Sequence, residues 1–223
     1  MMKIILKQYK SGQVGVKKQK RRKGGLGVMV GFDDFPLVKR TSEEWASYAM
    51  GDFNKFLQDH ANCERKASAL CMSFVAKYSD RAPLIEPMIA LAREELEHFH
   101  QVYKLMWRRG IGIGPDEKDP YINGIMGQLR HGRDERLLDR LVASALVEAR
   151  GCERFELVSQ YLEDSELSDF YHVLAKSEGG HYRVFIKLAE QFFTKSEVAQ
   201  AVERIAKIES EVMLASPFRH ALH

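Results

Sequence analysis

The sequence predicts an all-α protein in which four long helices form one bundle and a shorter helix lies before and after it. Apolar residues recur at spacings of three and four along most of the chain after residue 41, which is the period of a helix with one buried face. Capping residues, prolines and glycines separate these stretches. The 223 residues, 45% of them hydrophobic, are enough for one sizeable core.

Capping patterns and breaks set the expected helix boundaries. Thr41 and Glu44 have the spacing of a capping box and predict a short first helix through Trp45. A proline in a first turn suits a helix start, so the second long helix is expected to begin after Pro83. Thr194 and Glu197 predict a last helix to about residue 214. The four long helices are expected at residues 52–78, 84–109, 134–162 and 166–192.

The lengths of the connections predict how the four helices are arranged. Short turns join the first two helices and the last two, so the members of each pair must be antiparallel neighbours. A connection of roughly twenty residues, containing Pro115, Pro120 and Gly124, separates the two pairs. It can cross the full length of the bundle and leave the second and third helices parallel, which is ferritin-like connectivity.

Two Glu-x-x-His pairs lie on separate predicted helices, Glu95/His98 and Glu178/His181. Positions i and i+3 share a helix face, so each pair can aim a carboxylate and an imidazole at one point. Both pairs are centred in apolar stripes, where an unpaired carboxylate costs several kcal/mol unless a cation compensates it. A third match, Glu97/His100, is turned roughly 200° from His98 and is assigned to a solvated face.

Single glutamates on the other two long helices complete the set. Glu64 is the only acid on the apolar stripe of its helix. On the third long helix Glu148 and Glu153 both compete. Spacing favours Glu148, because it precedes Glu178 by 30 residues and Glu64 precedes Glu95 by 31, whereas Glu153 precedes Glu178 by only 25. The repeated Cys-Glu-Arg at 63–65 and 152–154 favours Glu153.

We expect Glu148 as the ligand and Glu153 as an alternative ligand or a neighbour of the ligands, bridged to Arg150 or Arg154. His60 lies one turn before Glu64 and is expected to form a hydrogen bond beside the site or to be an additional ligand. The adjacent glycines at 179 and 180 predict space for a bound molecule, a local helical distortion or close packing against another helix.

Four carboxylates and two imidazoles suit iron or manganese better than zinc. The ligand set alone leaves several classes of protein open. They are a di-metal oxygenase, a ferritin-like ferroxidase or iron store, a manganese catalase, a quinone hydroxylase, and a metal-free interaction protein whose glutamates form buried ion pairs.

Composition limits the surroundings of the protein. No apolar run approaches the roughly 20 residues that span a bilayer, and the first residues do not resemble a secretory leader. The three cysteines are expected as reduced thiols of a cytoplasmic protein. Residues 1–24 hold nine basic side chains and no acid, which leaves 25 of the 34 basic residues against all 31 acidic ones. We expect residues 1–40 to form a flexible basic arm and residues 41–223 to form the bundle. The arm could be an RNA-attracting tail, a product of start-site choice or an inert extension.

Four stretches resemble the bacterial tRNA 2-methylthio-N6-isopentenyladenosine hydroxylase family. They are HANCERKA at 60–67, LAREELEHFHQV at 91–102, VEARGCERF at 147–155 and KSEGGHY at 176–182, in the order typical of the family. The resemblance covers most of residues 41–215 and does not extend to the basic arm.

The resemblance implies a non-haem di-iron monooxygenase with two iron ions per chain. It would hydroxylate the isopentenyl group of the modified adenosine beside the tRNA anticodon, at position 37. The reaction would use O2 and two electrons from a reductase or ferredoxin. Glu95 and Glu178 would bridge the metals, Glu64 and Glu148 would be terminal ligands, and His98 and His181 would each bind one metal.

Two basic clusters are candidates for tRNA contact, although charges at helix ends are often solvated caps. They are Trp107, Arg108 and Arg109 before the long connection, and Arg130, His131 and Arg133 after it. The oligomeric state is left open.

Overall fold

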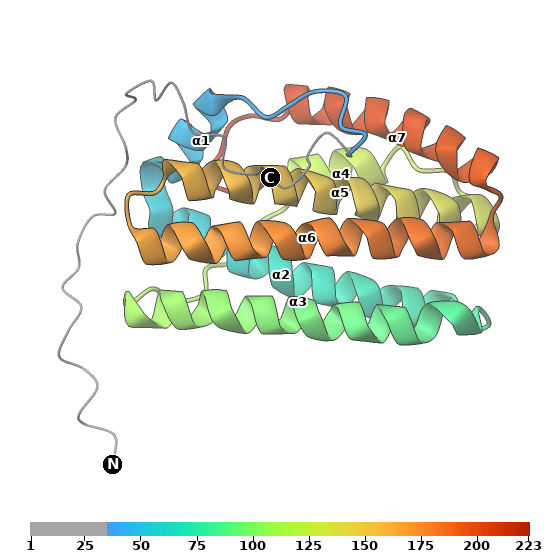
Figure 1. Cartoon of the computed structure of the whole chain (residues 1–223), viewed down its shortest axis with the longest axis horizontal. Helices are drawn as coiled ribbons and strands as arrows, with labels where there is room; N and C mark the ends of the chain where they lie inside the picture. The colour runs from blue at the N-terminus through green and yellow to red at the C-terminus, as the bar shows by residue number, and fades with distance from the viewer. Residues whose placement is uncertain (1–34) are drawn as a thin grey trace, which may run out of the picture.

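A computed structural model describes residues 35–223, and this part of the chain is built from helices without strands. Four long helices lie side by side and form the bundle (Figure 1). They are α2 (Phe53–Lys77), α3 (Ala82–Arg108), α5 (Arg133–Tyr161) and α6 (Ser165–Phe192). The shorter elements are α1 (Glu43–Ala49), the 3-10 turn η2 (Met50–Asp52), α4 (Pro120–Met126) and α7 (Lys195–Ala215). The predicted fold class is confirmed.

Ion pairs between helix ends establish the direction of each helix. Arg133 lies 2.6 Å from Asp80, and Asp134 lies 2.5 Å from Arg81. These contacts place the start of α5 beside the turn from which α3 starts. The helices α3 and α5 therefore run in the same direction, and the chain between them returns along the whole bundle, as ferritin-like connectivity requires.

Helix starts follow local capping chemistry, with one prediction wrong. Thr194 and Glu197 form the predicted capping box of α7. At α1 the cap is Ser42, whose hydroxyl accepts from the Trp45 N–H at 3.3 Å, and not Thr41. The Thr41 hydroxyl instead donates to the buried carboxylate of Glu153, so a tertiary contact overrides the local pattern.

The sequence analysis missed the helix α4 inside the long connection. Its start has two ordinary signals, because the Asp119 side chain caps the N–H groups of Tyr121 and Ile122, and Pro120 is the first helical residue. Seven residues are too few for a clear apolar period. Gly124 permits α4 to approach α7, since a Cβ there would lie 2.7 Å from a methyl group of Val212.

Part of residues 1–40, which were expected to form a flexible arm, packs against the bundle. Phe35 is buried and packs edge-to-face on Tyr182 with 4.9 Å between ring centroids, and Leu37 is buried as well. The Lys39 carbonyl accepts a hydrogen bond from Arg150. The segment therefore contacts the bundle through the buried side chains of Phe35 and Leu37 and the Lys39 carbonyl, whereas Val38 is exposed. The rest of the predicted arm, residues 1–34, lies outside the described residues.

The chain's cysteines, Cys63, Cys71 and Cys152, all lie in the described range and are free thiols. Within residues 35–223 the helices lack the combination of length and hydrophobicity needed to cross a lipid bilayer.

Candidate di-metal site

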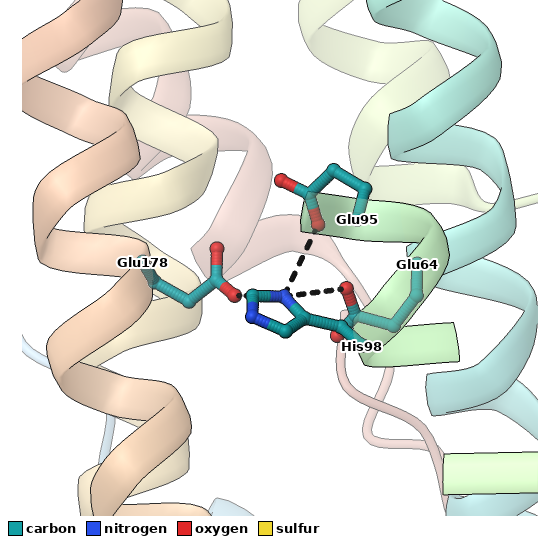
Figure 2. A group of neighbouring side chains, drawn as sticks. All are labelled: Glu64, Glu95, His98 and Glu178. Carbon is teal, nitrogen blue, oxygen red and sulfur yellow. Dashed lines mark ion pairs between the residues drawn. The ribbon is translucent and has the colours of Figure 1, made fainter. Parts of the chain in front are cut away.

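The six residues expected as ligands converge inside the bundle. They form two groups, in each of which one ligand atom per residue lies within 4.8 Å of the others. The first group, drawn in Figure 2, comes from α2, α3 and α6, and the second from α3, α5 and α6. Their members are Glu64, Glu95, His98 and Glu178, and Glu95, Glu148, Glu178 and His181. Glu95 and Glu178 belong to both groups.

The two shared glutamates divide their oxygens between the histidines. Glu95 places Oε1 2.8 Å from His181 Nδ1 and Oε2 3.5 Å from His98 Nδ1. Glu178 places Oε1 3.4 Å from His98 Nδ1 and Oε2 3.3 Å from His181 Nδ1. A carboxylate whose oxygens face two different imidazoles has the orientation needed to bridge two cations.

The other two glutamates are each associated with one histidine. Glu64 Oε2 lies 3.7 Å from His98 Nδ1 (Figure 2), whereas Glu148 belongs to the group of His181. Each half of the arrangement therefore contains one imidazole and one glutamate of its own, together with the two shared glutamates.

Unsatisfied polar atoms test whether a cation fits this arrangement. His98 Nδ1, His181 Nδ1 and Glu178 Oε1 are buried, and although they lie close to one another and to Glu95, none of these contacts has the geometry of a hydrogen bond. Buried polar atoms are normally paired, and these three all point to the centre of the ligand groups. Metal ions would satisfy them, so the residues fit a di-metal site.

The distal nitrogens of the two histidines are held across the bundle. His98 Nε2 lies 3.2 Å from the Ser177 hydroxyl on α6, and His181 Nε2 lies 3.0 Å from Glu94 Oε2 on α3. Such hydrogen bonds orient an imidazole and leave Nδ1 free to bind a metal. Neither residue was predicted from the sequence, although each directly precedes a glutamate of the ligand set.

His60 links Glu64 to a buried tyrosine. Its Nε2 lies 2.7 Å from Glu64 Oε1, and its Nδ1 lies 3.2 Å from the Tyr171 hydroxyl. Burial lowers the pKa of His60 to about 3, so the ring is neutral, donates to Glu64 and accepts from Tyr171. His60 thus positions Glu64 and does not belong to either ligand group.

Glu153 lies outside both ligand groups. Its carboxylate accepts hydrogen bonds from the backbone N–H and hydroxyl of Thr41 and from Arg150. Arg150 is fully buried and also binds both carboxylate oxygens of Glu209 on α7. Arg154 donates to the Leu222 carbonyl. These residues tie α5 to α7 and to the segments before α1 and after α7.

Proton binding offsets the negative charge of the ligand groups. Burial, reinforced by the charge of Glu178, raises the pKa of Glu95 to about 7. Burial also raises the pKa of Glu64 and of Glu148. Burial alone would lower the pKa of His98, but the surrounding carboxylates outweigh it and raise this pKa to about 12. Metal ions that bind here must therefore displace protons.

A cavity of about 520 Å³ ends at the ligand groups. Four of the six ligand residues, Glu64, Glu95, Glu148 and Glu178, are among the residues that line it. The lining is mostly apolar, with contributions from Leu70, Ile122, Ile125, Met126, Val147 and Phe155. Polar residues of the segment before α4, Asp116, Glu117, Lys118 and Asp119, line another part of its wall. A small apolar group can therefore lie against the site away from bulk water.

The glycine pair in α6 does not contribute to this cavity. The helix is continuous through Gly179 and Gly180. A Cβ at Gly179 would lie 3.4 Å from the Phe35 ring and 3.6 Å from Cys152 Sγ, which is close packing, whereas Gly180 has open space beside it.

The two clusters suggested for tRNA contact lie at opposite ends of the bundle. Trp107, 73% exposed, and Arg108 close α3, and Arg109 packs over the Phe53 ring at the start of α2. At the other end Arg130 binds the buried Asp139 and Arg133 binds Asp80. His131 lies between these two arginines in the sequence and is exposed. None of these basic residues lines the cavity.

Glu97 and His100 are exposed on the outer face of α3, as predicted for the third Glu-x-x-His match.

A bundle of this connectivity, with two carboxylate–imidazole groups that share two glutamates, defines the class of ferritin-like di-metal carboxylate proteins. Residues 30–223 match the model of the family described as tRNA-(MS[2]IO[6]A)-hydroxylase (MiaE). The chain belongs to this family.

Two relatives agree with the family assignment, and a solved structure agrees with the fold. The chain is 40% identical over 173 residues to the tRNA 2-(methylsulfanyl)-N(6)-isopentenyladenosine(37) hydroxylase of Pseudomonas putida. The aligned region covers 78% of this chain and 84% of that protein. It is 32% identical over 140 residues to the protein of the same name from Salmonella typhimurium, covering 63% of this chain and 51% of that one. The structure of "Protein 43 with aldehyde deformylating oxygenase activity from Synechococcus" matches with a TM-score of 0.80 and 32% identity, over 84% of this chain and 94% of that one.

Proposed function

We propose that this protein hydroxylates the isopentenyl group of 2-methylthio-N6-isopentenyladenosine at position 37 of tRNA, as the names of its relatives state for them. The reaction consumes O2, two electrons and two protons, and it gives the allylic alcohol and one water molecule. The observation that carries this proposal is the mostly apolar cavity that ends at Glu64, Glu95, Glu148 and Glu178. An isopentenyl group is small, branched and apolar, and suits such a cavity.

Glu95 and Glu178 would bridge two iron ions in this proposal. Glu64 and His98 would complete the set around one ion, and Glu148 and His181 the set around the other. Oxygen-rich ligands with one imidazole per ion suit iron. Bound there, the iron pair would supply O2 activation and the transfer of one oxygen atom to a C–H bond.

The protein's own residues would supply order and exclude water. Ser177 and Glu94 keep the two imidazoles turned with Nδ1 inward, and His60 keeps Glu64 in place. The apolar side chains of the cavity would hold the isopentenyl carbon beside the ligand groups and keep bulk water away from it. The electrons would come from a reductase or ferredoxin in the cytoplasm.

For the RNA itself we propose contacts at the end of α3. Trp107 offers an exposed ring on which a base can stack, and Arg108 and Arg109 can bind phosphates. This cluster leads directly into the chain segment that lines the cavity. Replacement of Arg108 and Arg109 by Glu should weaken tRNA binding strongly, and unchanged affinity would remove both residues from the interface.

Nucleoside analysis of tRNA from cells that lack the gene tests the proposed reaction. The unhydroxylated isopentenyl nucleoside should accumulate, and expression of the native protein should restore the hydroxylated form. An unchanged modification profile would refute the tRNA assignment.

Metal analysis of the purified protein tests the proposed site. We expect two iron ions per chain, and their loss when Glu95 and Glu178 are both replaced by Gln. Iron loading far above two per chain would instead indicate an iron store, and rapid peroxide disproportionation with bound manganese would indicate a catalase.

A further inference from the structure

Residues 111–119, which we call the strap, connect α3 to α4 without regular structure and form part of the cavity wall. Four consecutive strap residues line the cavity, and three of them are acidic: Asp116, Glu117 and Asp119. Any RNA that brings its modified base to the ligand groups through this part of the wall must meet the strap. Acidic residues at that position are unexpected, because they repel phosphates.

Two of the three acidic side chains, those of Asp116 and Glu117, form ion pairs with three cations, whereas Asp119 caps α4. Asp116 binds Arg65 at 2.8 Å and Lys66 at 2.5 Å, each through one carboxylate oxygen. Glu117 binds Arg219 at 2.6 Å, and its carbonyl accepts from Lys66 at 3.0 Å. Arg65 and Lys66 project from α2 directly after the ligand residue Glu64. Three positive charges therefore lie along the strap beside the cavity.

These attachments are weak because they are open to water. Asp116 and Glu117 are 52% and 68% exposed in their ion pairs. Exposed ion pairs contribute little to stability, because water screens the charges and the long side chains lose freedom when they pair. The strap has one further hydrogen bond to α2, from Gln58 to the Gly112 carbonyl. Release of Asp116 and Glu117 from their partners therefore costs little free energy.

We propose that Arg65, Lys66 and Arg219 are a binding site for backbone phosphates of the RNA, and that Asp116 and Glu117 occupy this site until the RNA displaces them. The proposal rests on the proposed function, since it gives the tRNA backbone a place beside the cavity. Displacement exchanges carboxylate–cation pairs for phosphate–cation pairs, so the number of ion pairs is kept. Release of counterions from the RNA adds a favourable contribution, and the freed strap widens access to the cavity.

The first experiment removes the competing charges. The variant D116N/E117Q should bind an unmodified anticodon stem-loop RNA about five- to tenfold more tightly than the native protein, because the phosphates no longer compete with two carboxylates. Fluorescence anisotropy with labelled RNA measures this. The matched control D169N/E190Q removes the same charge from exposed positions of α6 and should change affinity less than twofold or so.

Two results would overturn the competition. One is that D116N/E117Q and the native protein bind the RNA with equal affinity. A change in the thermal stability of the variant would not alter this conclusion. The other is an equal gain in the control, since this would be a general effect of net charge.

The second experiment removes the cations. The variant R65Q/K66Q should bind the RNA more weakly, and the slope of log affinity against log salt concentration should fall by about two, one for each phosphate that the variant no longer binds. The control K176Q/K187Q removes two exposed lysines of α6 and should keep the native slope. An unchanged slope for R65Q/K66Q would remove these residues from the RNA site.

The binding experiments use unmodified RNA, so they do not depend on hydroxylation. Failure of the proposed function appears in the nucleoside analysis of cells that lack the gene. Failure of the phosphate-site proposal appears only in the binding data, with hydroxylation by the native protein intact.

Discussion

The hydrogen bond between Glu94 and His181 gives a prediction whose magnitude follows from the geometry. Glu94 Oε2 lies 3.0 Å from His181 Nε2, and the Glu94 side chain is 59% exposed. Removal of a partner that orients a metal-binding histidine typically costs 10- to 100-fold in metal affinity. Water can reach the imidazole from the exposed side and replace part of the contact. We therefore expect about tenfold, or roughly 1.4 kcal/mol, for Glu94→Ala.

The weakening should be confined to one of the two metal positions. Glu94→Ala should weaken the ion held by His181, whereas Ser177→Ala should weaken the ion held by His98. Glu94→Gln keeps an oxygen acceptor and should stay within about threefold of the native affinity. Glu97→Ala is the matched control, because it removes an exposed glutamate of the same helix that lies outside both ligand groups.

Titration of the metal-free protein with Co²⁺, followed by absorbance, resolves the two positions. Native affinity at both positions in Glu94→Ala would refute the orienting role, as would weakening of the same position in Glu94→Ala and Ser177→Ala. A Gln variant as weak as the Ala variant would show that the charge of Glu94, and not its hydrogen bond, is required.

Three further predictions concern stability. Burial opposes ionisation of Asp139, but the ion pairs with Arg130 and Arg204 outweigh it and hold the pKa of this carboxyl below its usual value. The substitution Asp139→Asn should therefore lower the free energy of unfolding by about 2 kcal/mol. The stabilisation by the ionised Asp139 is present above the pKa of the unfolded state and is lost as the pH falls through the pKa of the folded state. Urea unfolding should therefore show a smaller stability difference between the native protein and Asp139→Asn at pH 3 than at pH 7. Equal differences at the two pH values would contradict this prediction. Gly124→Ala should lower the free energy of thermal unfolding by about 1–3 kcal/mol, because the added Cβ contacts Val212. Adding Val212→Ala to this variant should restore most of the lost stability. Additive effects of the two substitutions would disprove the contact. Fe²⁺ or Mn²⁺ at 100 times its dissociation constant should stabilise the protein by about 2.7 kcal/mol for each occupied position, and chelation should reverse this. An unchanged melting temperature would argue against metal binding to the folded state.

Helix positions and connectivity could be predicted because both depend on local properties. The apolar period and the capping residues are short-range features, and loop length limits which helices can be antiparallel neighbours. The placement of Glu95 with His98, and of Glu178 with His181, follows from the i, i+3 geometry of a single helix. Local rules failed where a distant residue competed, as when Thr41 binds Glu153 and leaves the cap of α1 to Ser42.

The sequence by itself determined the helices other than α4, their order and direction, and a set of acidic and histidine candidates on buried faces. Only the tertiary structure decided which candidates meet. It places Glu148 in a ligand group while Arg150 and Thr41 bind Glu153, and it pairs Glu94 with His181 across 87 positions of the chain. It also lays the acidic strap along α2. Helical periodicity specifies which face a residue occupies, but not the residue that faces it from another helix, because that depends on how whole helices pack.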